Sequence, residues 1–289
     1  MADGCPGPIW MQRGFPSDNY GRNHDAVRPH QQASGETMYE GLTVVVTGGG
    51  RGLGLGIARR FGQAGFLTVI AESDMAAGDH AVEMLQAEGW AAQLEPLDVR
   101  DHRQSSELVD RLVKQHGRID VWVNNAGISK LAPAETMPLD FWDDSIAVML
   151  TGTFYCAQAA GKHMLSRKKG VIVNIASVTG MMHHKDRAAY STAKAGVIAL
   201  TEALGVEWAA RGVRVVGVAP GVVMTEMTRE TISEGQGTLA AFQRRTPMQR
   251  LGEVTEIAEA VFYLASDEAS YVTAETMRVD GGWVAYQLF

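Results

Sequence analysis

From residue 42 onward, short apolar runs alternate with longer amphipathic stretches, and this alternation constrains the fold more than any other feature. Seven runs have the length and β-branched composition of strands that are covered on both faces: 43–46, 67–71, 92–97, 121–124, 171–175, 214–219 and 277–279. Helix-length stretches lie between them, at 53–64, 75–88, 102–116, 139–164, 189–210 and 255–265. Strands that alternate with helices favour an α/β, doubly wound parallel sheet with helices on both faces.

The domain boundaries follow from where this rhythm starts and where it breaks. Because the series of strands is unbroken, we expect one domain over residues 39–289. Residues 224–251 interrupt the rhythm and predict a small helical lid. Residues 1–38 are rich in glycine and proline and predict a flexible or irregular arm. This arm is either an artefact of the start site or a segment that packs on a neighbouring subunit. We also expect the aromatic tail, residues 283–289, to pack on a partner subunit.

Charge and composition exclude several classes of protein. The net charge of −7 argues against nucleic acid or an anionic membrane as a partner. No apolar run approaches the ~20 residues that span a bilayer, and residues 1–40 show no secretory signal. Cys5 and Cys156 are too far apart in the sequence to form a local metal or redox pair. They suit two free thiols in a reducing cytosol, with Cys156 packed in the core, so we expect a cytoplasmic protein without a metal.

A glycine-rich loop follows the first predicted strand and precedes the first predicted helix. It contains Gly48, Gly52 and Gly54, a spacing that departs from the common G-x-G-x-x-G pattern. Glycines let the backbone approach a pyrophosphate, and the helix N-terminus offers unpaired N–H groups to the anion. A generic glycine turn is the alternative interpretation. The position between a strand and a helix favours a dinucleotide site.

The charged residues near this loop indicate which dinucleotide it binds. Glu72 ends the second strand about 20 residues after the glycines, where a carboxylate accepts hydrogen bonds from the adenosine ribose. Glu72 would repel a 2′-phosphate, and Asp74 adds to that repulsion. Arg51 acts in the opposite direction, because a guanidinium in the loop could hold a 2′-phosphate. Since Glu72 occupies the ribose position itself, we predict NAD(H) over NADP(H).

Three further residues form a set suited to proton transfer. Tyr190 and Lys194 are four residues apart and share one face of a helix, and Ser177 lies thirteen residues upstream. A tyrosine with its usual pKa of about 10 is a poor base, but a nearby ammonium favours the phenolate and lowers that pKa. Ser177 could hydrogen-bond a substrate oxygen. Together they can move a proton on or off an alcohol while a nicotinamide exchanges hydride.

These motifs resemble those of the short-chain dehydrogenases/reductases over roughly residues 40–283. Further similar motifs lie at 98–99, 124–127, 220–225 and 279–282. The resemblance implies a Rossmann-like fold in a homotetramer or dimer, catalysis by Ser177, Tyr190 and Lys194, and contact between Lys194 and the nicotinamide ribose. It also implies that the cofactor is bound by these residues: Gly48, Arg51, Gly52, Leu53, Gly54, Glu72, Asp98, Val99, Asn125, Ala126, Gly127, Tyr190, Lys194, Pro220, Gly221, Val223 and Thr225.

One residue departs from the family pattern. The family commonly has an asparagine where this chain has Met149, and that asparagine is thought to kink its helix and hold a water in a proton relay to the lysine. Methionine has no strong donor or acceptor. The relay is therefore absent, rerouted, or supported by backbone and water alone.

The loop between Ser177 and Tyr190 is the predicted source of substrate specificity. His183 and His184 in this loop could donate to substrate hydroxyls or to a carboxylate, although solvated histidines are the alternative. We predict an NAD-dependent dehydrogenase of a polar, small-molecule secondary alcohol such as a sugar, polyol or hydroxy acid. Two alternatives stay open. A 3-oxoacyl thioester reductase is disfavoured by Glu72, and a non-catalytic dinucleotide-binding protein is supported by Met149 alone.

Overall fold

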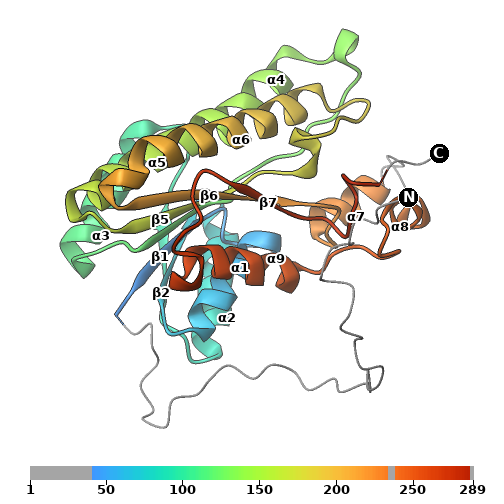
Figure 1. Cartoon of the computed structure of the whole chain (residues 1–289). Helices are drawn as coiled ribbons and strands as arrows, with labels where there is room; N and C mark the ends of the chain where they lie inside the picture. Colours follow the sequence, from blue (N-terminus) through green and yellow to red (C-terminus); the bar gives the residue numbers. More distant parts are fainter. Residues whose placement is uncertain (1–40, 234–237, 287–289) are drawn as a thin grey trace, which may run out of the picture. The chain divides into compact units, whose positions relative to one another are not determined.

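A seven-stranded sheet forms the centre of the computed structural model, which describes residues 41–233 and 238–286 (Figure 1). All neighbouring strands are parallel, in the order β3-β2-β1-β4-β5-β6-β7. The strands are β1 (Thr43–Thr47), β2 (Leu67–Glu72), β3 (Ala92–Pro96), β4 (Val121–Asn124), β5 (Gly170–Ile175), β6 (Val213–Pro220) and β7 (Thr276–Val279). The predicted doubly wound sheet is confirmed. Its strand order reverses between β1 and β4, where such sheets bind ligands.

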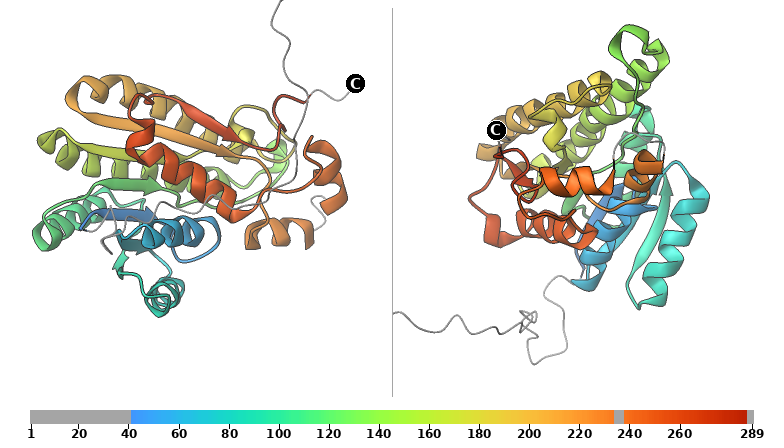
Figure 2. Two further views of the ribbon diagram at one scale, coloured as in Figure 1. Left: turned by 60° about the horizontal axis from the view of Figure 1, so that its bottom comes forward. Right: turned by 90° about the vertical axis from the view of Figure 1, so that its right-hand side faces the viewer.

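Helices cover both faces of the sheet (Figures 1 and 2). One layer contains α1 (Gly52–Gln63), α2 (Met75–Ala87) and α9 (Val254–Ala265), and the other contains α3 (His102–His116), α5 (Gly152–Arg167) and α6 (Ala188–Trp208). Side chains of β1 alternate between the two cores: Val44 and Val46 join α1 and α9, and Val45 joins α3 and α5. Cys156 is fully buried in the second core, as predicted, and burial raises the pKa of its thiol to about 12. Cys5 lies outside the described residues.

The predicted helix at 139–164 is interrupted in the structure. It consists of α4 (Leu139–Ile146), a π-helical turn over Ala147–Thr151, and α5. A π turn adds one residue to a helical repeat, and hydrophobic periodicity in the sequence barely records so small a change. Met149 lies in this turn and is 1% exposed.

The segment 224–251 contains two short helices, α7 (Glu226–Ser233) and α8 (Leu239–Arg245), after the end of β6. Figure 1 shows them together at one end of the sheet. The predicted N-terminal arm, residues 1–38, lies outside the described residues, as do residues 287–289 of the tail. Trp283, which we expected to pack on a partner subunit, is instead 3% exposed and packs in its own chain against Phe242, with ring centroids 6.4 Å apart. Across the described ranges, no helix is both long and apolar enough to cross a bilayer.

Candidate active site

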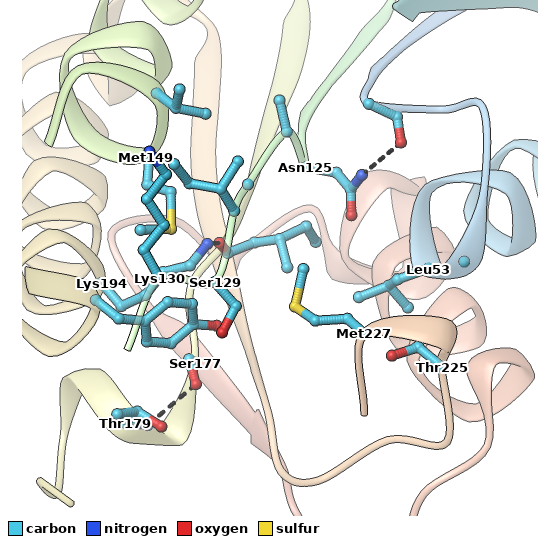
Figure 3. Close-up of a pocket in the computed structure, with 18 of the residues that line it drawn as sticks. Leu53, Asn125, Ser129, Lys130, Met149, Ser177, Thr179, Lys194, Thr225 and Met227 are labelled. Carbon is cyan, nitrogen blue, oxygen red and sulfur yellow. Dashed lines mark hydrogen bonds between the residues drawn. The ribbon is translucent and has the colours of Figure 1, made fainter. Parts of the chain in front are cut away.

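A cavity of about 1330 Å³ opens beside the carboxyl ends of the central strands (Figure 3). Its lining includes Ser177, Tyr190 and Lys194, together with every residue that the sequence analysis assigned to cofactor binding. In the view of Figure 3, Lys130 and Lys194 lie on one side of the pocket, and Leu53 and Thr225 lie on the other. The fold therefore gathers one set of predicted residues from seven separate stretches of the chain.

The glycine loop has the geometry of a phosphate cradle. Gly48 and Gly52 adopt left-handed conformations, with φ of +62° and +54°, which favour glycine. A Cβ at Gly54 would lie 2.1 Å from the Gly48 carbonyl oxygen, so only glycine lets the loop close this tightly, whereas a Cβ at Gly52 would meet open space. Helix α1 has no side-chain cap and no acidic residue in its first turn. These features fit a dinucleotide pyrophosphate at the N-terminus of α1.

Glu72 is held beside this cradle by backbone N–H groups. Its Oε2 accepts from the N–H of Gly50 at 3.2 Å, and its Oε1 accepts from Ser73 at 2.9 Å and Asp74 at 3.2 Å. Arg51 lies across the same opening and pairs with Asp74, with 3.7 Å between Nη1 and Oδ2. The carboxylate is therefore fixed at the end of β2, whereas the guanidinium is largely exposed and already has an acidic partner.

Asn125 and Asp98 support the cavity wall. The side-chain amide of Asn125 donates to the carbonyl oxygens of Thr47 and Gly48, both at 3.0 Å, which ties the end of β4 to the glycine loop. Asp98 accepts from the guanidinium of Arg100, and that hydrogen bond is the main reason why the pKa of its carboxyl is lowered. Asp98 and Asn125 both line the cavity.

A buried chain of hydrogen bonds, missed by the sequence analysis, connects β4 and β5 to α6. Asn124 donates to Asn174 Oδ1 at 2.8 Å, Asn174 donates to Thr201 Oγ1 at 2.9 Å, and Thr201 donates to the Val197 carbonyl at 2.7 Å. Asn174 stands in an otherwise apolar strand, and this polar residue was the available signal. Because α6 also carries Tyr190 and Lys194, the chain fixes the helix that presents them.

Lys194 is 5% exposed and donates from Nζ to the Ile175 carbonyl oxygen at 2.6 Å. Burial lowers its pKa to about 8. Burial also raises the pKa of Tyr190, whereas a hydrogen bond with Ser177 and the positive charge of Arg187 lower it. We expected the ammonium of Lys194 to be the charge that lowers the tyrosine pKa. Instead its Nζ lies 5.9 Å from the ring centroid, held by the carbonyl of Ile175.

The structure separates the two histidines proposed for the substrate. His184 lines the cavity, and its ring packs edge-on against Trp283 at 6.0 Å between centroids. Burial lowers its pKa, and the charges of Arg187 and Arg245 add to that effect. His183 is not part of the lining; its Nδ1 lies 3.3 Å from the Thr179 carbonyl oxygen. Within the ranges that the structure covers, no cluster of three or more His, Cys, Asp or Glu side chains is arranged to hold a metal.

Met149 lines the cavity from the π turn. Its carbonyl oxygen accepts from Thr153 Oγ1 at 2.7 Å, so this turn keeps a backbone hydrogen bond although the side chain supplies none. We expect Met149→Asn to keep or raise turnover, because the amide restores a donor and an acceptor to the cavity wall. Burying a more polar side chain should lower the free energy of unfolding by roughly 1–3 kcal/mol.

Steady-state kcat and thermal unfolding check this prediction, and Met149→Leu is the matched control. The leucine variant conserves volume and apolarity, so its kcat should stay near that of the parent protein. Complete loss of activity in Met149→Asn would contradict our alignment of this helix with the family pattern.

Comparisons with known proteins cover nearly all of the described chain. The family profile described as Enoyl-(Acyl carrier protein) reductase matches residues 48–284. The chain is 40% identical to the 3beta-hydroxysteroid dehydrogenase 1 of Eggerthella lenta over 87% of this chain and 98% of that protein. It is 38% identical to a 3-oxoacyl-(acyl-carrier-protein) reductase of Thermotoga maritima over 85% of this chain and 98% of that protein. A crystal structure of a gluconate 5-dehydrogenase from Burkholderia cenocepacia, in complex with NADP and tartrate, superposes with a TM-score of 0.82 at 34% identity, covering 86% of this chain and 97% of that one.

Proposed function

We propose a cofactor, a mechanism and a substrate class for this chain, which belongs to the short-chain dehydrogenase/reductase family. It is an oxidoreductase that acts on hydroxyl or keto groups. Our proposal is that it is an NAD-dependent dehydrogenase of a polar secondary alcohol. The observation that carries the cofactor assignment is the backbone-anchored carboxylate of Glu72.

Glu72 supports NAD through both hydrogen bonding and charge. Its oxygens accept from three backbone N–H groups, so the carboxylate cannot easily turn away from the end of β2, where an adenosine ribose would lie. A ribose diol can donate to these oxygens, whereas a 2′-phosphate would bring like charges together. Arg51 favours NADP, and the Burkholderia relative binds NADP, but Arg51 here is paired with Asp74. The balance of these charges supports NAD.

The proposed mechanism assigns one task to each of three side chains. NAD, when bound, supplies the hydride acceptor. Tyr190 takes the hydroxyl proton of the substrate through its phenolic oxygen, and Ser177 orients the substrate oxygen by hydrogen bonding. Lys194, buried beside Tyr190, would hold the nicotinamide ribose, and the positive charge of Arg187 favours the phenolate of Tyr190. In balance, a secondary alcohol and NAD⁺ give a ketone, NADH and H⁺.

The substrate end of the cavity contains polar groups among apolar walls. His184 and Lys130 line it together with Trp283 and Met227. This mixture suits a small polar alcohol, and it is consistent with the gluconate 5-dehydrogenase among the structural relatives. A 3-oxoacyl thioester reductase is the second candidate, favoured by the relative from Thermotoga maritima. An assay of the purified protein with NAD⁺ or NADP⁺ against sugars, polyols, hydroxy acids and hydroxyacyl esters separates the two.

Removing the carboxylate of Glu72 should weaken the preference for NAD. We expect Glu72→Ala to lower the ratio of kcat/KM for NAD⁺ over NADP⁺ by about tenfold or more, equivalent to at least about 1.4 kcal/mol. The exposed Glu83 on α2 does not line the cavity, so Glu83→Ala is the control for a general change in charge. An unchanged ratio in Glu72→Ala would overturn the NAD assignment.

A further inference from the structure

Two cations of the cavity lining, Arg187 and Lys185, have no partner among the described residues, and of these only Arg187 is partly buried. Arg51 pairs with Asp74, Arg100 with Asp98, and Lys130 with Asp144, while Lys194 donates to the Ile175 carbonyl. Arg187 also lines the cavity and is half-buried, yet its guanidinium makes no ion pair or hydrogen bond with any residue of 41–233 or 238–286. Lys185, the other unpaired cation of the lining, is exposed to solvent. Arg187 is therefore both unpaired and partly removed from solvent.

The backbone on both sides of Arg187 is fixed. The carbonyl oxygen of Asp186 accepts from the N–H of Ala132 at 3.1 Å, which joins this loop to the loop after β4. The carbonyl oxygen of Arg187 itself accepts from the N–H of Ser191 at 2.8 Å as α6 begins. Asp186 adopts a left-handed conformation, with φ of +63°, and its carboxylate does not pair with the adjacent guanidinium. These hydrogen bonds fix the backbone position of Arg187, and no described acidic side chain neutralises its guanidinium.

Arg187 lies close to the proposed reacting centre. It is the N-cap residue of α6, three positions before Tyr190. Both line the same cavity. The positive charge of Arg187 lowers the pKa of the Tyr190 phenol. A group bound by the guanidinium would therefore be near an oxygen bound by Tyr190.

The acidic residues of the lid do not supply the missing partner. Glu226 and Glu230 line the cavity from α7, but both are exposed and neither forms an ion pair with Arg187. A guanidinium presents a planar fork of N–H donors that matches a carboxylate through two parallel hydrogen bonds. A partly desolvated guanidinium gains more from such a partner than a fully hydrated one does.

We propose that Arg187 binds a carboxylate of the substrate, and that the alcohol oxidised here is accordingly a hydroxy acid. This inference rests on the proposed dehydrogenase function and narrows its substrate class. The reaction converts a hydroxy acid anion and NAD⁺ to an oxo acid anion, NADH and H⁺. The carboxylate keeps its charge throughout and serves to orient the carbinol toward Tyr190.

Matched pairs of substrates test the proposal. Gluconate and sorbitol differ chiefly in a carboxylate against a hydroxymethyl group, and 3-hydroxybutyrate and its methyl ester differ in charge. We expect the parent protein to show a higher kcat/KM for the acid of at least one pair. Arg187→Gln should lower kcat/KM for that acid by about 30-fold or more and change the neutral partner much less. Arg187→Lys keeps the positive charge but lacks the planar fork of donors, so its kcat/KM for the acid should lie between those of the parent protein and Arg187→Gln.

Arg229→Gln is the matched control, because Arg229 is an exposed arginine on α7 that does not line the cavity. Calorimetric titration of malonate into the protein with NADH gives a readout that does not depend on turnover. Malonate binding should weaken in Arg187→Gln and persist in Arg229→Gln. If Arg187→Gln fails to fold, Arg187→Lys and the substrate ratio of the parent protein carry the test.

The outcomes separate this inference from the function on which it rests. Turnover of neutral alcohols with no advantage for acids, or equal losses on acid and neutral substrates in Arg187→Gln, would overturn the carboxylate site and leave the dehydrogenase intact. No turnover of any alcohol with either cofactor would overturn the proposed function. In that case, malonate binding that does not depend on Arg187 would overturn the carboxylate site as well.

Discussion

Tyr190→Phe is expected to lower kcat by ~10²–10⁴-fold, the range that a placed proton-transfer group typically contributes. The substitution removes one hydroxyl, the atom that takes the substrate proton in the proposed mechanism, and keeps the ring that helps to close the cavity. The fold should therefore persist. Steady-state kinetics of alcohol oxidation measure the loss, while thermal unfolding and NADH binding show whether the protein is otherwise intact.

The pH dependence of the same reaction provides a second readout. A base acts only when deprotonated, and burial raises the pKa of Tyr190. Oxidation by the parent protein should therefore accelerate as pH rises through the alkaline range, and the residual activity of Tyr190→Phe should lack this rise. Tyr271→Phe is the control, because Tyr271 is fully exposed to solvent. Near-normal turnover by Tyr190→Phe would refute the assignment of the base.

Lys194→Met is expected to abolish most activity and, at the same time, to change how stability depends on pH. The variant removes the cation that would hold the nicotinamide ribose, and the loss of one such electrostatic group typically costs ~10²–10³-fold in kcat. It also removes the donor to the Ile175 carbonyl oxygen, which lies 2.6 Å from Nζ. That carbonyl then loses its partner, at a cost of roughly 1–3 kcal/mol.

Burial lowers the pKa of Lys194 from 10.5 to about 8 in the folded protein. Between these two values the unfolded chain binds more protons than the folded protein does, so the free energy of unfolding rises with pH across that window. The full rise from this group is about 3 kcal/mol, and below pH 8 it adds no slope, because lysine is protonated in both states.

Urea unfolding between pH 7 and 10.5 measures this effect as the difference between parent and variant. The difference cancels the titration of groups that the two proteins share. We expect the free energy of unfolding of the parent protein to increase relative to that of Lys194→Met as pH rises from 8 to 10.5. If the free energies of unfolding of parent and variant change in parallel with pH, the pKa of Lys194 is not lowered, and the proposed effect of its burial is wrong.

Patterns that are local in the sequence were sufficient to determine the architecture. Strand-length apolar runs separated by amphipathic stretches predict a parallel sheet, because a buried strand needs both faces apolar and a parallel crossover needs a helix. The glycine loop was identifiable for the same reason, since Gly54 stands where a side chain would meet the Gly48 carbonyl. Glu72, Ser177, Tyr190 and Lys194 were each identified as chemically suitable, and their gathering around one cavity follows from the order of the strands.

The partners of the side chains were decided only by the tertiary structure. Lys194 bonds to the Ile175 carbonyl, nineteen residues away, and Arg187 is the charge that lowers the pKa of Tyr190. Within the described residues, the lack of a partner for Arg187 became apparent only once the other charges of the cavity had been paired. His183 and His184 are adjacent in the chain, yet one lines the cavity and the other does not. Sequence periodicity records which face of an element is buried, whereas hydrogen bonds and ion pairs depend on atoms brought together from distant parts of the chain.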